Sequence, residues 1–101
     1  MFYLYILYSV SSDKYYIGYS DNTDRRLFEH NNNLRSTTYT SKHRPWVLKK
    51  TIELGDSRSF AMKIEKTIKK SKSRILVEKI IEEVNSLGDL AQLVRVPMCR
   101  D

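Results

Sequence analysis

The chain has 101 residues, of which 41% are hydrophobic and 30% charged, so it is long enough for one domain and too apolar to be disordered. Eighteen Lys and Arg against twelve Asp and Glu give a formal charge of +6, which favours nucleic acid over an acidic membrane surface as the partner. The single cysteine, Cys99, cannot form an internal disulfide, and we expect a cytoplasmic protein.

The first third of the chain predicts a β-hairpin followed by a helix. Residues 2–10 are aromatic and β-branched, a composition that predicts a buried strand. The segment is too short to span a membrane. A turn then leads to a second strand over residues 14–20, antiparallel to the first. In this strand Gly18 indicates a bulge or the close approach of another group to the backbone. A short helix is predicted over residues 24–31.

The rest of the chain predicts one more strand and two helices. Residues 35–44 are polar and basic and predict an exposed loop, and residues 46–54 predict a third strand. Asp56 or Ser57 is expected to cap one amphipathic helix, and Ser73 a second. The expected fold is α+β: a three-stranded antiparallel sheet in the order strand, strand, helix, strand, helix, helix, with the helices flanking the sheet.

We expect the chain to consist of one folded domain over residues 1–84 and a peripheral tail over residues 85–101. The tail contains an LAQLVRV run between Gly88 and Pro97 that matches no periodicity found earlier in the chain. The tail resembles the peptide made when a reading frame runs on into a tRNA gene, so it is expected to lack a selected function.

Five side chains are candidates for chemistry. Tyr5 and Tyr16 are predicted to face the same side of the hairpin, although strand tyrosines also serve as plain core residues. Arg26 and His30 are spaced i, i+4 and could converge on one phosphate, or be solvated surface residues. Glu65 is a lone carboxylate on a basic helix, where its alternative role is a surface ion pair with the lysine one turn later.

Taken together, these residues resemble the GIY-YIG nuclease superfamily, in its small stand-alone bacterial form. The resemblance rests on Tyr3-Leu4-Tyr5, on Tyr15-Tyr16-Ile17-Gly18, and on the run from Arg25 to Asn31. It continues through Tyr39-Thr40, Arg44-Pro45-Trp46 and the helix from Ala61 to Lys69. The first motif departs from the family pattern, with Tyr-Leu in place of Gly-Ile. Structure-specific flap nucleases and the incision subunit of bacterial excision repair have similar catalytic domains.

The resemblance implies a role for each candidate. It places Tyr5 and Tyr16 at the two motif tyrosines, Arg26 at the catalytic arginine and His30 at the histidine one turn later. Glu65 falls on the metal-binding carboxylate, which implies one divalent ion, Mg²⁺ or Mn²⁺. One of the tyrosines is then the general base. We favour Tyr5, with Tyr16 or His30 orienting it and nearby cations lowering its pKa.

The expected function is a metal-dependent endonuclease acting on branched or flapped DNA in repair or recombination. Phosphate contacts are expected from two basic clusters, one in the loop and one on the helix. They comprise Lys42, His43 and Arg44, and Lys66, Lys69 and Lys70. Two alternatives use the same basic face: a nucleic-acid-binding module without catalysis, and a scaffold for an acidic protein. We expect a monomer that does not bind membranes and that takes specificity from DNA shape or from a protein partner.

Overall fold

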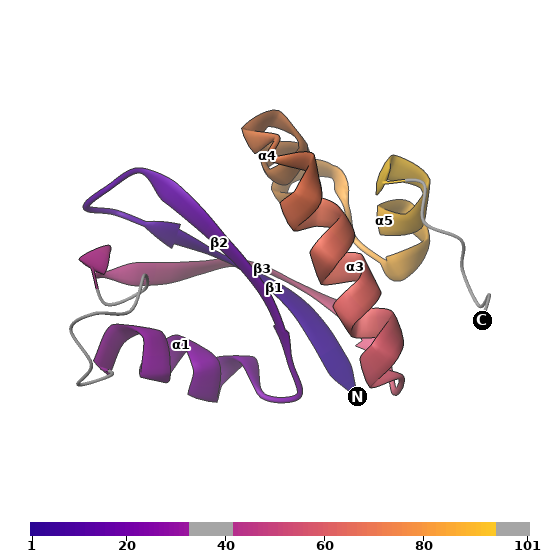
Figure 1. Cartoon of the computed structure of the whole chain (residues 1–101), viewed down its shortest axis with the longest axis horizontal. Helices are drawn as coiled ribbons and strands as arrows, with labels where there is room; N and C mark the ends of the chain where they lie inside the picture. Colours follow the sequence, from indigo (N-terminus) through magenta and orange to yellow (C-terminus); the bar gives the residue numbers. More distant parts are fainter. Residues whose placement is uncertain (33–41, 95–101) are drawn as a thin grey trace.

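The computed structural model of the chain describes residues 1–32 and 42–94. The elements in these ranges are β1 Phe2–Ser9, β2 Lys14–Ser20, α1 Thr23–Asn32, β3 Trp46–Gly55, α3 Arg58–Ser71, α4 Arg74–Glu83 and α5 Leu87–Val94 (Figure 1). Most of the predicted exposed loop lies outside the described residues, as do Tyr39 and Thr40. No helix in the described part of the chain has the length and apolarity needed to cross a membrane.

The three strands form one antiparallel sheet in the order β2-β1-β3, which confirms the predicted α+β fold. In the hairpin Tyr5 lies opposite Gly18, and Leu7 lies opposite Tyr16. Because side chains alternate between faces along a strand, Tyr5 and Tyr16 share one face, as predicted. The central strand is β1, so β2 is an edge strand whose outer side is not covered by β3.

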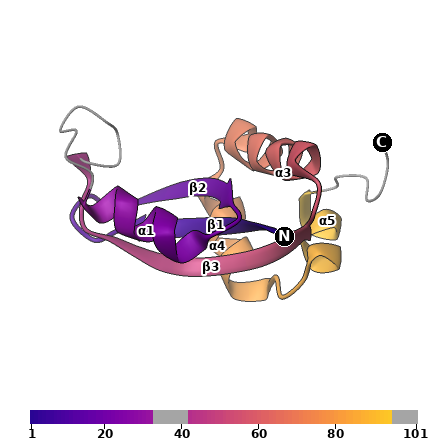
Figure 2. The ribbon, with the colours of Figure 1, turned by 90° about the horizontal axis from the view of Figure 1, so that it is seen from below.

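Helices cover both faces of this sheet, with α1 on one side and α3 on the other (Figure 1). Alternation along β1 divides the core accordingly. Leu4 and Ile6 join the apolar cluster that includes Ile64 of α3. Tyr5 joins a smaller cluster with Leu7, Trp46 and, at its margin, a leucine of α1. The view from below shows α3 beside the β2 side of the sheet (Figure 2). The edge strand therefore runs between the two helices that flank it.

The two helices after β3 begin at the predicted serine caps. Ser57 Oγ accepts a hydrogen bond from the Phe60 backbone N–H at 3.2 Å, and Ser73 Oγ accepts one from the Leu76 N–H at 3.1 Å. These bonds satisfy N–H groups that have no partner inside the helix. Between the helices Lys72 adopts a left-handed conformation, with φ of 51°, and closes the end of α3. The caps thus fix where α3 stops and α4 starts.

The chain after α4 differs from the expected peripheral tail. Residues 87–94 form α5, and in this helix Leu90 is fully buried and Ala91 nearly so. Leu90 belongs to the same apolar cluster as Ile64 and Ile80. The LAQLV run matches helical spacing over too few residues for periodicity to reveal it. Up to residue 94, therefore, the C-terminal segment is part of the packed core.

Candidate active site

Four of the five candidate side chains line one groove of about 480 Å³ at the β2 edge of the sheet. Tyr5 comes from β1, Tyr16 from β2, Arg26 from α1 and Glu65 from α3, so the groove draws on four elements. The other residues that line it are Phe2, Tyr19, Ser20, Asp21, Arg25 and Arg58. The groove forms because the edge strand passes between the two helices, which leaves both helix surfaces facing the same opening. We call it the catalytic groove.

Gly18 allows Tyr5 to reach this edge. A Cβ atom built on Gly18 would lie 2.5 Å from Tyr5 Cζ, a distance that real side chains do not tolerate. The Tyr5 ring therefore lies directly against the backbone of β2, which confirms the close approach predicted for this glycine. The absence of a side chain at position 18 thus leaves room for the phenol at the edge of the sheet.

The two tyrosines sit in different surroundings within the groove. Their rings are stacked, with centroids 6.3 Å apart. Burial raises the pKa of Tyr5 to about 12, an effect that its hydrogen bond with Arg26 opposes but does not cancel. Arg26 therefore lowers the pKa of Tyr5, as expected of a nearby cation, but burial outweighs this effect. Tyr16 is only half-buried and has the Lys69 ammonium 5.2 Å from its ring centroid.

His30 lies behind Tyr5 and does not line the catalytic groove. It is 5% exposed, and its Nε2 is 3.1 Å from Tyr5 Oη. Burial, together with the charge of Arg26, lowers the pKa of His30 to about 4, so the imidazole is neutral at pH 7. The expectation that His30 and Arg26 converge on one phosphate is therefore wrong, because this imidazole contacts the phenol and is shielded from the groove.

Arg26 carries a positive charge at the junction of the tyrosines and the groove. Burial alone would lower its pKa, but hydrogen bonds with Tyr5 and Glu29 raise it overall. Its Nη1 is 2.7 Å from Glu29 Oε1 on the same helix. This pair orients the guanidinium and leaves the side chain partly exposed to the groove. A guanidinium held in this way can donate to the non-bridging oxygens of a phosphate.

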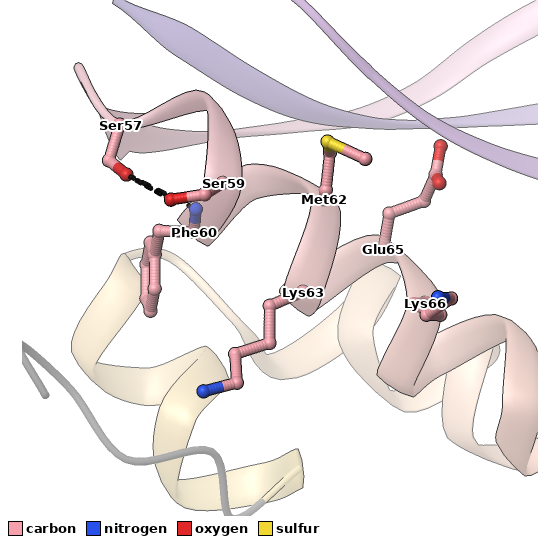
Figure 3. Close-up of a pocket in the computed structure, with 7 residues that line it drawn as sticks. All are labelled: Ser57, Ser59, Phe60, Met62, Lys63, Glu65 and Lys66. Atoms are coloured by element: carbon pink, nitrogen blue, oxygen red, sulfur yellow. Dashed lines mark hydrogen bonds between the residues drawn. The ribbon is translucent and has the colours of Figure 1, made fainter. Parts of the chain in front are cut away.

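Glu65 supplies a carboxylate to the same groove from the opposite helix. Its side chain is 22% exposed, and its ion pair with Lys69 is long, with 3.7 Å between Oε2 and Nζ. Glu65 also borders a second cavity of about 620 Å³ along α3, formed mainly by Ser57, Phe60, Met62 and Lys63. In that cavity the Glu65 carboxylate extends toward the strands, whereas Lys63 extends away from them (Figure 3). The carboxylate thus faces the tyrosine hairpin.

Glu65 is the candidate ligand for a divalent ion. No cluster of three or more His, Cys, Asp or Glu side chains occurs in residues 1–32 and 42–94, so a zinc-type cage is not formed there. Mg²⁺ is bound in many sites by one or two carboxylates and completes its shell with water and substrate oxygens. A half-buried carboxylate with one long ion pair, facing an open groove, fits that kind of binding, and the arginines of the groove suit the phosphate that would share the ion.

The residues predicted for phosphate contacts are scattered by the fold. Arg44 points inward, where its Nε donates to the His30 carbonyl at 2.9 Å, and His43 Nδ1 lies 2.8 Å from Ser12 Oγ. Lys66 borders the cavity along α3. Lys42 and Lys70 are exposed but do not line the catalytic groove. Of this predicted set, Lys69 lies closest to the candidate chemistry.

Two arginines of the groove escaped the sequence analysis. Arg25 lies beside Arg26 on α1, and its Nη2 is 3.3 Å from Asp21 Oδ1. Arg58 starts α3, and a hydrogen bond with Tyr19 raises its pKa. A sequence signal existed for Arg58, because the positive end of the helix dipole disfavours a cation in the first turn. A cation at that position therefore does not stabilise the helix through its dipole.

Comparison with known proteins matches most of the chain to a family. A family model described as the GIY-YIG catalytic domain matches residues 1–79 of the 101 residues. The matched range includes all five candidate residues: Tyr5, Tyr16, Arg26, His30 and Glu65. A search of curated proteins gives no significant match.

Proposed function

The chain belongs to the GIY-YIG catalytic domain family, a family of nucleases, and on that premise we propose that it is a metal-dependent endonuclease that hydrolyses phosphodiester bonds in DNA. The observation that carries the proposal is the groove itself, where Glu65 faces Arg26 and two tyrosines. Phosphodiester hydrolysis needs an activated water, charge neutralisation at phosphorus and stabilisation of the leaving oxygen. The four side chains match those needs.

Arg26 binds the scissile phosphate in this proposal. Its planar donors meet the non-bridging oxygens and strengthen as negative charge grows on them. Arg25 and Arg58 line the same groove and hold the neighbouring backbone by charge. These contacts read phosphate and not base edges, which supports selection of DNA by its shape, as in a branch or flap.

Glu65 would hold one divalent ion, either Mg²⁺ or Mn²⁺. When bound, such an ion supplies Lewis-acid charge beside the phosphate and the leaving oxygen. The other charged groups of the groove, three arginines and Asp21, leave the site cationic enough to attract a phosphate backbone.

Tyr5 and Tyr16 have different roles in the proposed reaction. Tyr5 was the favoured general base, but its burial and its raised pKa oppose loss of its proton. Tyr16 is more accessible than Tyr5, so we assign the role of base to the Tyr16 phenolate, which accepts the proton of the attacking water. The water oxygen then forms the new O–P bond while the bond to the leaving oxygen breaks, and the leaving oxygen takes up a proton from solvent. Tyr5, tied to His30 and Arg26, orients the guanidinium and the neighbouring ring.

Cleavage assays on flapped and branched DNA test this proposal. With Mg²⁺ or Mn²⁺ the protein should nick such substrates, and Glu65→Gln and Arg26→Lys should each lower kcat by about 10²–10³-fold. DNA binding measured in EDTA should change little. Glu82→Gln, at an exposed position of α4, is the matched control and should cut normally. Binding without cutting under any metal would instead identify a binding module that has no catalysis.

Two phenylalanine substitutions separate the tyrosines. Tyr16→Phe should lower kcat by about 10²–10⁴-fold, the range for loss of a general base, and should flatten the rise of the rate with pH. Tyr5→Phe should lower the rate less and retain that rise. The reverse order would return the base to Tyr5. For the cellular pathway in which the nuclease acts, we propose DNA repair or recombination.

A further inference from the structure

A second groove of about 570 Å³ opens beside the catalytic groove. It lies between β2 and the junction of α3 with α4, and Tyr16 lines both grooves. The Glu65–Lys69 ion pair joins them as well, because Glu65 lines the first and Lys69 the second. A polymer that occupies the first groove can therefore continue into the second along the edge strand. We call this second space the lysine groove.

The charge of the lysine groove is strongly positive. Its basic residues are Lys14, Lys69, Lys72 and Arg74, against the single carboxylate of Asp13. Arg74 is already engaged, with its Nη2 2.7 Å from Asp13 Oδ1. Lys14 and Lys72 are exposed and form no ion pair with another residue in the described part of the chain. Two ammonium groups therefore remain for an anionic ligand.

The walls of the lysine groove are fixed before any ligand binds. Asp13 Oδ1 accepts a hydrogen bond from Tyr8 Oη at 2.6 Å, and Arg74 Nη1 donates to the Asp13 carbonyl at 2.8 Å. Arg74 Nε also pairs with Glu78 at 3.1 Å. These bonds hold the tip of the hairpin against α4. A prearranged surface loses less entropy on binding, which favours affinity.

From this placement we infer that the lysine groove binds a single nucleic-acid strand next to the scissile phosphate, with Lys14 and Lys72 on its phosphates. The inference rests on the proposed function and extends it to the path of the substrate. A space of about 570 Å³ holds a short stretch of one strand. Aromatic rings beside cations are typical of surfaces for single strands, and the rings of Tyr15 and Tyr16 line this groove beside its cations.

Fluorescence anisotropy with a labelled oligothymidylate and with a hairpin duplex tests the inference. The test variant is Lys14→Gln/Lys72→Asn, since asparagine tolerates the positive φ of Lys72. In EDTA it should weaken binding of the single strand roughly fivefold and reduce the slope of log K against log salt by about 1.4, the effect of two lost contacts. The control, Lys63→Gln/Lys79→Gln, removes the same charge from exposed positions outside the groove and should do neither.

Three results would overturn the inference: an unchanged single-strand affinity, an equal loss in the control, or a loss confined to the duplex. A cleavage assay with Mg²⁺ keeps this outcome separate from the proposed function. In an active enzyme the groove variant should raise KM and leave kcat nearly unchanged, which marks lost binding and not lost chemistry. If no substrate is cut but the groove variant still loses single-strand binding selectively, the nuclease proposal fails and the inference that the lysine groove binds a single strand is upheld.

Discussion

At the scale of single residues, the site depends on which side chains lie next to Tyr5. Gly18 gives the ring room to lie on the backbone of the edge strand, and His30 takes a position behind the hydroxyl. Arg26 supplies the opposing charge. Gly18 constrains the phenol from β2, and Arg26 and His30 constrain it from α1, so a change at any of them should shift the ring and, through it, the groove.

Gly18→Ala is expected to destabilise the protein and to disturb the groove. The new Cβ would collide with the Tyr5 ring, and overpacking of this kind costs about 1–3 kcal/mol. Urea denaturation measures the cost. Gly88→Ala is the control, because its Cβ meets only Ser86 Oγ at 3.7 Å. It should be neutral or mildly stabilising within the helix. Equal stability of Gly18→Ala and the natural chain would refute the close contact.

The neutral state of His30 predicts an acid-sensitive fold. The unfolded chain takes up a proton on this residue near pH 6.5, but the folded chain does so only near the lowered pKa of about 4. Since the unfolded state binds more protons between these values, stability is present above pH 6.5 and is lost as the pH falls toward 4. The expected loss is on the order of 3 kcal/mol.

Thermal denaturation of the natural chain and of His30→Gln across this pH range isolates the effect. Other titrating groups contribute equally to both proteins, so the difference between their stabilities should shrink as the pH falls. Two curves that stay parallel from pH 7 to 4 would contradict a buried neutral imidazole.

At the scale of elements, short local signals place the helices and long-range packing places the site. Ser57 and Ser73 fix the starts of α3 and α4. The orientation of α3 then follows from its apolar face, which includes the buried residues Ile64 and Ile68. Glu65 lies at the border of that face, which brings it to the groove. The helix α5 extends the same core beyond the range matched by the family.

Leu90→Ala tests whether α5 is structural. Leu90 is fully buried, and truncating a buried leucine costs about 2–5 kcal/mol through lost burial and the cavity that remains. Gln92→Ala changes an exposed residue of the same helix and should stay within about 0.5 kcal/mol. Denaturant titration compares the two. A Leu90→Ala protein as stable as the natural chain would restore the idea of a peripheral tail.

At the scale of the whole molecule, the sequence predicts the elements better than the contacts. The strands, the hairpin and both serine caps were predictable because each depends on neighbours within a few residues. The inward turn of Arg44 and the burial of His30 were not, since both depend on packing between distant elements. The meeting of Glu65 with Arg26 was expected from family resemblance, because no local pattern relates positions so far apart in the chain.

The candidate active site is also a property of the whole molecule, because no single helix or strand contains all of its residues. The catalytic groove and the lysine groove both follow the β2 edge, and the molecule measures 39 × 26 × 21 Å, so together they define a substrate path along one side of a small protein. The central claim is that Glu65 and Arg26 face each other across this edge with the tyrosine hairpin between them.

Paramagnetic broadening by Mn²⁺ tests that claim most directly. When Mn²⁺ is titrated into the ¹⁵N-labelled protein, the account predicts that the amide signals of Tyr5, Gly18, Arg26 and Glu65 broaden first and together. The same titration of Glu65→Gln should leave those signals sharp. Broadening centred elsewhere, or a pattern that Glu65→Gln does not change, would contradict a shared metal-binding groove.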